Sequence, residues 1–239
     1  MTKIQVAGLN CQIVDALNGN EPELLAFLCH GFGAPGDDLV PLAQQYLLRH
    51  PSLQNKVRFV FPEAPLSLEA VGMPGSRAWW MIDMEALNRA MMTGEFRDLE
   101  DSCPEGMEEA REQFINVIDT LLKEYHLSYK NLVLGGFSQG AMLSVDSLLH
   151  LPETPAGMCL FSGTLLNKNK WKGLLAKHKG LKVVQSHGRQ DPILPFHLAD
   201  TLKTIMEDSE LNVTFIPFEG AHQIPENALR AYVEMLENL

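Results

Sequence analysis

The stretch NLVLGGFSQGAM, residues 131–142, decides the fold of this 239-residue chain. An apolar run typical of a buried strand leads into two glycines, and an apolar pattern typical of a helix resumes after FSQG. Residues 136–140 match G-x-S-x-G, which predicts that Ser138 lies on a sharp turn between a strand and a helix. That turn would hold the Ser138 hydroxyl above a sheet. A plain strand-to-helix turn with a capping serine is the alternative at this point.

Apolar, strand-like runs recur along the chain with amphipathic stretches between them. Most runs are unbroken, as in strands that are covered on both faces. Strands that alternate with helices predict an α/β fold, a mostly parallel central sheet flanked by helices, in a single domain over residues 1–239. The strand-like runs begin at Leu24, Val57, Asn131, Ala156, Leu181 and Asn212. The helical stretches cover residues 39–50, 105–125, 141–151, 197–207 and 227–239, and residues 3–16 indicate an edge strand or hairpin.

Residues 83–106 form the least regular segment. They are acidic, rich in methionine and only weakly periodic. The segment could be a surface excursion or a mobile lid over a site.

The charge and composition of the chain limit the partners and locations that we expect for it. The 19 basic and 30 acidic residues give a formal charge of −11, which disfavours nucleic acid as a partner. The sequence has neither a secretory leader nor an apolar run long enough to insert stably into a membrane, so we expect a cytoplasmic protein. No cysteines pair as CxxC and no Cys/His cluster has zinc-ligand spacing, so we expect free cysteines and no zinc site. The cysteines are Cys11, Cys29, Cys103 and Cys159.

A serine hydroxyl needs a base to become a nucleophile, and the base needs an orienting carboxylate. In this type of fold the acid and then the histidine follow the serine along the chain. Asp191 follows the apolar run at 181, and His222 follows the next run. Both loops would leave the sheet at the edge where the Ser138 turn lies. We therefore predict a catalytic triad of these three residues. His187 precedes Asp191 and so breaks the order.

Acyl transfer also needs N–H donors for the developing oxyanion. The backbone N–H of Gln139, next after the serine, is the first expected donor. The glycine-rich loop HGFG, which follows an early strand, supplies the second at Phe32. Because only the main chain of Gln139 is used, replacing its side chain by Ala should cost little. His30 is expected to brace the loop by hydrogen bonds.

An acyl group needs an apolar slot. Trp79 and Trp80 could form its wall, although buried packing is an equal alternative for each. Ile193 and Leu194 directly follow Asp191, and Leu194 is the expected lining residue.

The motifs HGFG, GFSQGAM, SHGRQDPILP and GAHQIP resemble those of the phospholipase/carboxylesterase family, which includes the acyl-protein thioesterases. The resemblance covers nearly the whole chain and implies an α/β-hydrolase fold, no metal or organic cofactor, and a possible homodimer. The residues that match are Phe32, Ser138, Gln139, Asp191 and His222. Ala221 replaces the second glycine of the usual GGH, and residues 83–106 differ from thioesterases.

The sequence thus predicts a serine carboxylesterase for short- to medium-chain carboxylic esters or thioesters, whose partner is a small acyl substrate. Acyl-protein thioesterase and lysophospholipase are alternatives that keep the same triad. A binding protein on a hydrolase scaffold is the alternative of another class, because a fold alone does not determine function.

Overall fold

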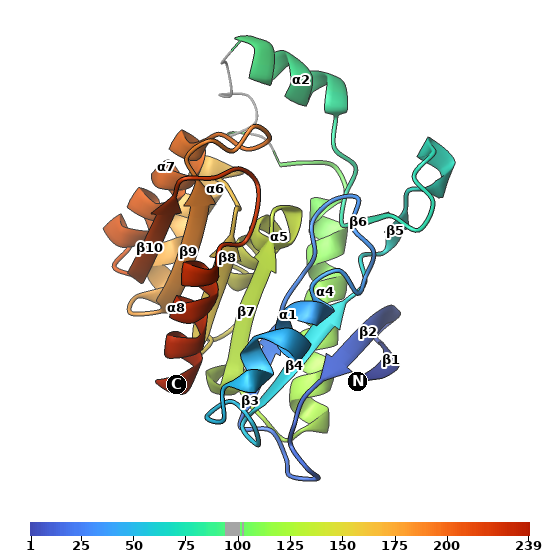
Figure 1. Ribbon diagram of the computed structural model, residues 1–239. Coiled ribbons are helices and arrows are strands. Elements are labelled where there is room, and N and C mark those ends of the chain that lie inside the picture. Colours follow the sequence, from blue (N-terminus) through green and yellow to red (C-terminus); the bar gives the residue numbers. More distant parts are fainter. Residues whose placement is uncertain (94–100, 102) are drawn as a thin grey trace.

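A computed structural model describes residues 1–93, 101 and 103–239. Within these residues, eight strands form one sheet in the order β1-β2-β4-β3-β7-β8-β9-β10 (Figure 1). β1, β2 and β4 pair antiparallel, and all other neighbours pair parallel. The strands are β1 (Thr2–Val6), β2 (Leu9–Val14), β3 (Leu24–Phe27), β4 (Val57–Pro62), β7 (Leu132–Phe137), β8 (Gly157–Phe161), β9 (Lys182–Gly188) and β10 (Asn212–Phe218).

Helices cover both faces of the sheet. Figure 1 shows α1 (Val40–Gln45) and α8 (Glu226–Glu237) on one face. On the other face lie α4 (Met107–Glu124), α5 (Gln139–Leu148), α6 (Lys168–Leu175) and α7 (Phe196–Asp208). Short 3₁₀ turns complete the connections: η1 (Leu47–Arg49), η2 (Glu69–Val71), η3 (Tyr129–Asn131) and η4 (Ala176–His178). This confirms the predicted α/β class and mostly parallel sheet.

The packing of β3 shows why the strands appear in the sequence as unbroken apolar runs. Leu25 and Phe27 pack into the core on the α4–α5 side, whereas Leu24 and Ala26 pack into the core on the α1–α8 side. Side chains alternate between the faces of a strand, so a strand covered on both faces must be apolar at every position.

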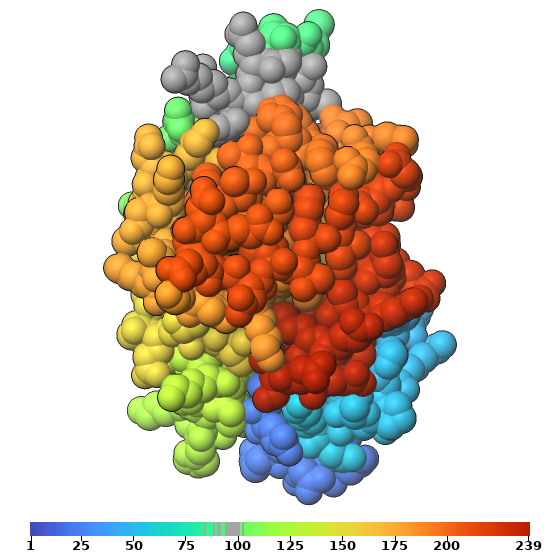
Figure 2. Space-filling model, turned by 90° about the vertical axis from the view of Figure 1, so that its left-hand side faces the viewer, coloured from blue at the N-terminus to red at the C-terminus, as the bar shows by residue number. Residues whose placement is uncertain are grey.

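Two helices were not expected from the sequence. α6 buries only Trp171 and Leu175, so its apolar signal is weak. α2 (Met84–Thr93) lies inside the irregular segment 83–106, of which residues 94–100 and 102 are outside the described part. Figure 1 shows α2 beyond the carboxyl ends of the parallel strands. Figure 2, which views the side of α7 and β10, shows α2 at the same end in green.

A two-stranded ribbon, β5 (Leu66–Ser67) and β6 (Arg77–Ala78), also lies near this end. Among the described residues, no helix combines the length and hydropathy that crossing a bilayer requires.

Candidate active site

Ser138 lies on a strained turn between β7 and α5. Its backbone angles are φ 54° and ψ −118°, a region that residues other than glycine rarely adopt. The Ser138 N–H donates to the carbonyl of Phe161 at 2.9 Å, which extends the β7–β8 pairing by one residue. Strain of this kind persists only where surrounding contacts enforce it, and it is common where a side chain must be presented for chemistry.

The flanking glycines are required by close packing. A methyl group on Gly140 would collide with the main chain of Cys29, which continues from β3. A methyl group on Gly136 would lie 2.5 Å from the carbonyl carbon of Gly140. The strand, the helix start and the neighbouring chain therefore approach one another as the G-x-S-x-G pattern predicts.

Strand register brings the Asp191 and His222 loops together. β9 and β10 pair along their whole length, and their last residues, Gly188 and Phe218, are partners. Beyond the strands, the N–H of Gln190 donates to the carbonyl of Gly220 at 3.0 Å. Two loops that leave adjacent parallel strands at the same level must run side by side.

Asp191 and His222 form a hydrogen-bonded pair. The Nδ1 of His222 lies 2.6 Å from the Oδ2 of Asp191, whose side chain is fully buried. The N–H groups of Ile193 and Leu194 donate to Oδ1, each at 2.9 Å. Burial alone would raise the pKa of Asp191, but the bonds from His222, Leu194 and Ile193 outweigh it and lower that pKa. The carboxylate is therefore ionised and an acceptor for the imidazole N–H.

His222 lies against the serine turn. Its ring packs on Phe137, the residue before Ser138, with 4.7 Å between ring centroids. The next residue is anchored as well, because the hydroxyl of Ser162 donates to the carbonyl of Gln223 at 3.1 Å. The side chain of His222 is 12% exposed, so the ring is largely covered but remains accessible to solvent.

The loop with Phe32 passes close to the serine. A methyl group on Gly31 would lie 3.2 Å from the Cβ of Ser138, and the half-buried Phe32 follows it. The loop is paired with β6 through Gly33, whose N–H donates to the carbonyl of Arg77 at 2.9 Å. This location is suitable for a second oxyanion donor beside the N–H of Gln139.

His30 has the bracing contacts expected of it. The N–H of Ala64 donates to its Nε2 at 3.1 Å, so the ring proton must be on Nδ1, 2.8 Å from the carbonyl of Gly31. Burial lowers the pKa of His30, which keeps the ring neutral.

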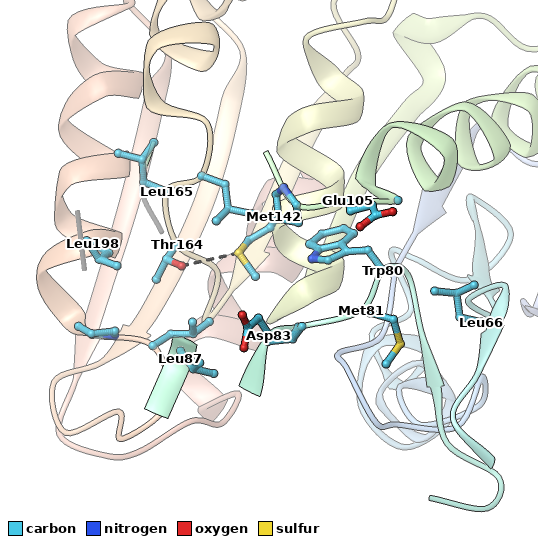
Figure 3. A pocket seen from close by; sticks show the side chains of 16 residues that line it. Leu66, Trp80, Met81, Asp83, Leu87, Glu105, Met142, Thr164, Leu165 and Leu198 are labelled. Carbon is cyan, nitrogen blue, oxygen red and sulfur yellow. Dashed lines mark hydrogen bonds between the residues drawn. The ribbon is translucent and has the colours of Figure 1, made fainter. Parts of the chain in front are cut away.

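An apolar cavity of about 680 Å³ includes Met142 of α5 and Leu194 of the Asp191 loop in its lining (Figure 3). Ser138, Asp191 and His222 are not among its described lining residues. Figure 3 shows Trp80, Met81 and Leu66 on one side and Thr164, Leu165 and Leu198 on the other, with Met142 between them. Met142 lies one helical turn beyond Ser138, since its N–H donates to the Ser138 carbonyl. The other described lining residues are Ile82, Asp83, Leu87, Pro104, Glu105, Gly106, Leu166, Leu194 and Pro195.

Of the residues expected to bind the acyl group, Trp80 and Leu194 line this cavity. Trp79 is not among its described lining residues: it is 1% exposed and packs beside Phe114, with 6.0 Å between ring centroids. Ile193 is likewise absent from the described lining and is 42% exposed. Met142 and Thr164 were not expected from the sequence, because each reaches the cavity only through the packing of its helix or loop.

Two polar side chains near the site were also missed. The amide of Gln139 bonds to the main chain of Trp79 and Trp80. The Nε2 of His187 lies 2.8 Å from the carbonyl of Leu194 and 3.4 Å from the Oδ2 of Asp191, so this buried ring supports the Asp191 loop. His187 was excluded from the triad because it precedes Asp191 in the sequence. The order of residues along the chain does not indicate whether a side chain supports a loop.

In the described part of the chain, no three His, Cys, Asp or Glu side chains are grouped so that they could hold a metal ion.

Comparison with solved structures identifies the fold. Esterase PE8 superposes with a TM-score of 0.79 at 24% identity, over 98% of this chain and 99% of that one. A carboxylesterase from Mesorhizobium loti gives 0.74 at 17% identity, over 100% of both chains. These similarities establish the α/β-hydrolase fold.

Sequence comparison identifies the family. Acyl-protein thioesterase 1 of Kluyveromyces lactis is 32% identical over 184 residues, 74% of this chain and 74% of that protein. Acyl-protein thioesterase 1 of Mycosarcoma maydis is 27% identical over 229 residues, 92% of this chain and 91% of that protein. The Phospholipase/Carboxylesterase family model matches residues 10–239, and the chain therefore belongs to the phospholipase/carboxylesterase family.

Proposed function

We propose that this protein is a serine carboxylesterase that hydrolyses short- to medium-chain carboxylic esters or thioesters through an acyl-serine intermediate. The observation that carries the proposal is the bonded Asp191–His222 pair, packed against the strained Ser138 turn. If the Asp191–His222 bond were only structural, the adjacent serine would not need a strained backbone. If Ser138 only capped the helix, it would not need a bonded aspartate–histidine pair beside it.

Acylation would use the three residues in the order of a triad. The Oγ of Ser138 attacks the acyl carbonyl carbon while the Nε2 of His222 takes its proton. Asp191, bonded to Nδ1, holds the tautomer that leaves Nε2 free to accept, and it stabilises the imidazolium that forms. The imidazolium then gives the proton to the leaving alcohol or thiol as the C–O or C–S bond breaks.

Deacylation would repeat these steps with water. His222 takes a proton from the water that attacks the acyl-serine, and it returns that proton to Ser138 as the acid leaves. In both tetrahedral intermediates the oxyanion would accept from the N–H groups of Gln139 and Phe32. Gln139 is at the start of α5, where the helix dipole adds to the stabilisation of negative charge.

The cavity whose lining includes Met142, one helical turn beyond Ser138, supports the proposed substrate class. Its lining is largely apolar and its volume, about 680 Å³, lies in the range of small-molecule sites. An acyl chain would pack between Trp80 and Leu194, with the carbonyl at Ser138. The described parts of the segment 83–106 contribute Leu87 and Glu105 to the wall, so we propose that these parts, residues 83–93 and 103–106, cover the acyl group.

A second candidate is an acyl-protein thioesterase, which the 32% identity to a relative of that name favours. A lysophospholipase would use the same triad. A thioesterase releases a thiol, so rates for matched oxygen and thiol esters of one acyl chain distinguish it from the other two candidates. Turnover of a lysophospholipid distinguishes the lysophospholipase from a simple carboxylesterase.

The partners and location complete the proposal. The free cysteines, of which Cys11, Cys29 and Cys159 are buried, suit the reducing cytoplasm.

We also propose a homodimer, on the family resemblance alone. Light scattering of the purified protein tests it: a mass equal to that of one chain would contradict it.

The decisive test of the proposed function is labelling with a fluorophosphonate, followed by peptide mapping. We expect one phosphonylated residue, Ser138, and turnover of a panel of p-nitrophenyl esters. A folded protein that stays unlabelled and inactive would instead support the binding-protein alternative.

A further inference from the structure

The side-chain amide of Gln139 is fully buried, and both its oxygen and its nitrogen form hydrogen bonds. Its Oε1 accepts from the N–H of Trp79 at 3.0 Å, and its Nε2 donates to the carbonyl of Trp80 at 2.8 Å. Gln139 directly follows Ser138, so these two bonds join the serine turn to a segment about 60 residues earlier in the chain.

That segment supports two parts of the site. The indole Nε1 of Trp79 donates to the carbonyl of His30 at 3.0 Å, just before the Phe32 loop. The ring of Trp80 faces the cavity, as Figure 3 shows. The Gln139 amide therefore holds a wall of the cavity at a defined distance from the reacting hydroxyl.

We propose that Gln139 is a positioning residue whose side chain sets the acyl-chain preference, by holding Trp80 in the cavity wall. The proposal rests on the proposed esterase function. An amide is needed because the Trp79 N–H requires an acceptor and the Trp80 carbonyl requires a donor. A carboxylate cannot donate, and an apolar side chain can do neither, so either would leave a buried polar group without a partner.

The main chain and the side chain of Gln139 have separable tasks. Every substitution except proline keeps the backbone N–H, which is the expected oxyanion donor. Loss of the side-chain bonds should therefore impair a substrate that packs against Trp80 more than a substrate too short to reach it.

The test compares kcat and KM for p-nitrophenyl acetate and p-nitrophenyl octanoate. In Gln139→Met and Gln139→Glu, the ratio of kcat/KM for octanoate to that for acetate should fall about tenfold, mainly through a higher KM for octanoate. Gln139→Asn keeps the amide but shortens its reach, so it should change the ratio in the same direction and serves if the other variants do not fold.

Gln185→Met is the matched control. Gln185 is also fully buried, and its Nε2 donates to the carbonyl of Ala199 at 2.8 Å, but it is not among the described residues that line the cavity. Its loss should lower the thermal midpoint and leave the octanoate/acetate ratio within about twofold of wild type. An equal change of the ratio in Gln185→Met would mean that general loosening is responsible, and would overturn the proposal.

A double-mutant cycle tests whether Gln139 acts through Trp80. Trp80→Ala should itself lower the octanoate/acetate ratio, and adding Gln139→Met should lower it no further. Additive effects, or an equal loss for both esters in Gln139→Met, would overturn the inference.

These outcomes are distinguishable from failure of the proposed function. Wild-type protein that neither reacts with a fluorophosphonate at Ser138 nor turns over any ester would overturn both. Active, labelled wild type with an unchanged ratio in the Gln139 variants would overturn this inference alone.

Discussion

The serine turn and the cavity wall are adjacent but are held by different means. Ser138, Asp191 and His222 each follow the end of a strand in one sheet, and backbone pairing carries their loops to the same edge. The wall is assembled from helices and loops that meet through side-chain packing and through the side-chain bonds of Gln139 to the Trp79–Trp80 segment. The difference indicates that chemistry and acyl-chain preference can be changed independently, and the following predictions test this separation.

Ser138→Ala should have the largest effect. Without the nucleophile, turnover should fall by about a millionfold, as it does when subtilisin loses its serine, and by the same factor for acetate and octanoate esters. Steady-state kinetics measures both, and circular dichroism checks the fold. Substantial residual turnover would assign the nucleophile elsewhere.

Asp191→Asn should follow. The amide keeps the shape and can still accept from Ile193 and Leu194, but its NH₂ group facing His222 favours the wrong imidazole tautomer. We expect a loss of about 10⁴ in kcat, as for the equivalent change in trypsin, again independent of acyl length. A loss confined to octanoate would contradict the separation of the two regions.

Leu194→Trp should affect the wall alone. The larger side chain would fill part of the cavity, so kcat/KM for octanoate should fall at least about tenfold while acetate changes little. Ile193→Trp is the matched control, because Ile193 is 42% exposed and outside the described lining. Equal losses for the two neighbours would indicate disturbance of the Asp191 loop instead.

His187→Gln should have the smallest effect and concerns stability. Burial lowers the pKa of His187, whose ring faces Asp191 and His222. At a pH between this lowered pKa and the usual value of 6.5, His187 is therefore protonated in the unfolded chain and neutral in the folded protein. Stability is therefore complete above about pH 6.5 and falls as the pH falls below it.

Removing this ring should make the free energy of unfolding less dependent on pH by up to about 1.4 kcal/mol per pH unit. Urea unfolding between pH 5 and pH 7 measures the slope. Asp191 does not interfere, because its lowered pKa places its own loss of stability below the usual value of 3.8. An unchanged slope would mean that His187 titrates alike in the folded and unfolded states.

The cavity was the least predictable part of the site. Trp79 and Trp80 are neighbours of the same type, yet one packs beside Phe114 and the other lines the cavity. No local pattern distinguishes them, because which face of the segment is covered depends on α4 and α5. The two bonds of the Gln139 side chain were missed for the same reason, since their partners are distant in the chain.

The main alternation of strands and helices, the α/β class and the loops of Ser138, Asp191 and His222 could be predicted from the sequence alone. Hydrophobic periodicity and glycine placement are local properties, and parallel pairing then brings the strand-end loops to one edge. The bond between Asp191 and His222, the support of that loop by His187 and the shape of the cavity were decided only by tertiary structure. Each depends on distances between residues far apart in the chain, which side-chain packing determines and local sequence does not encode.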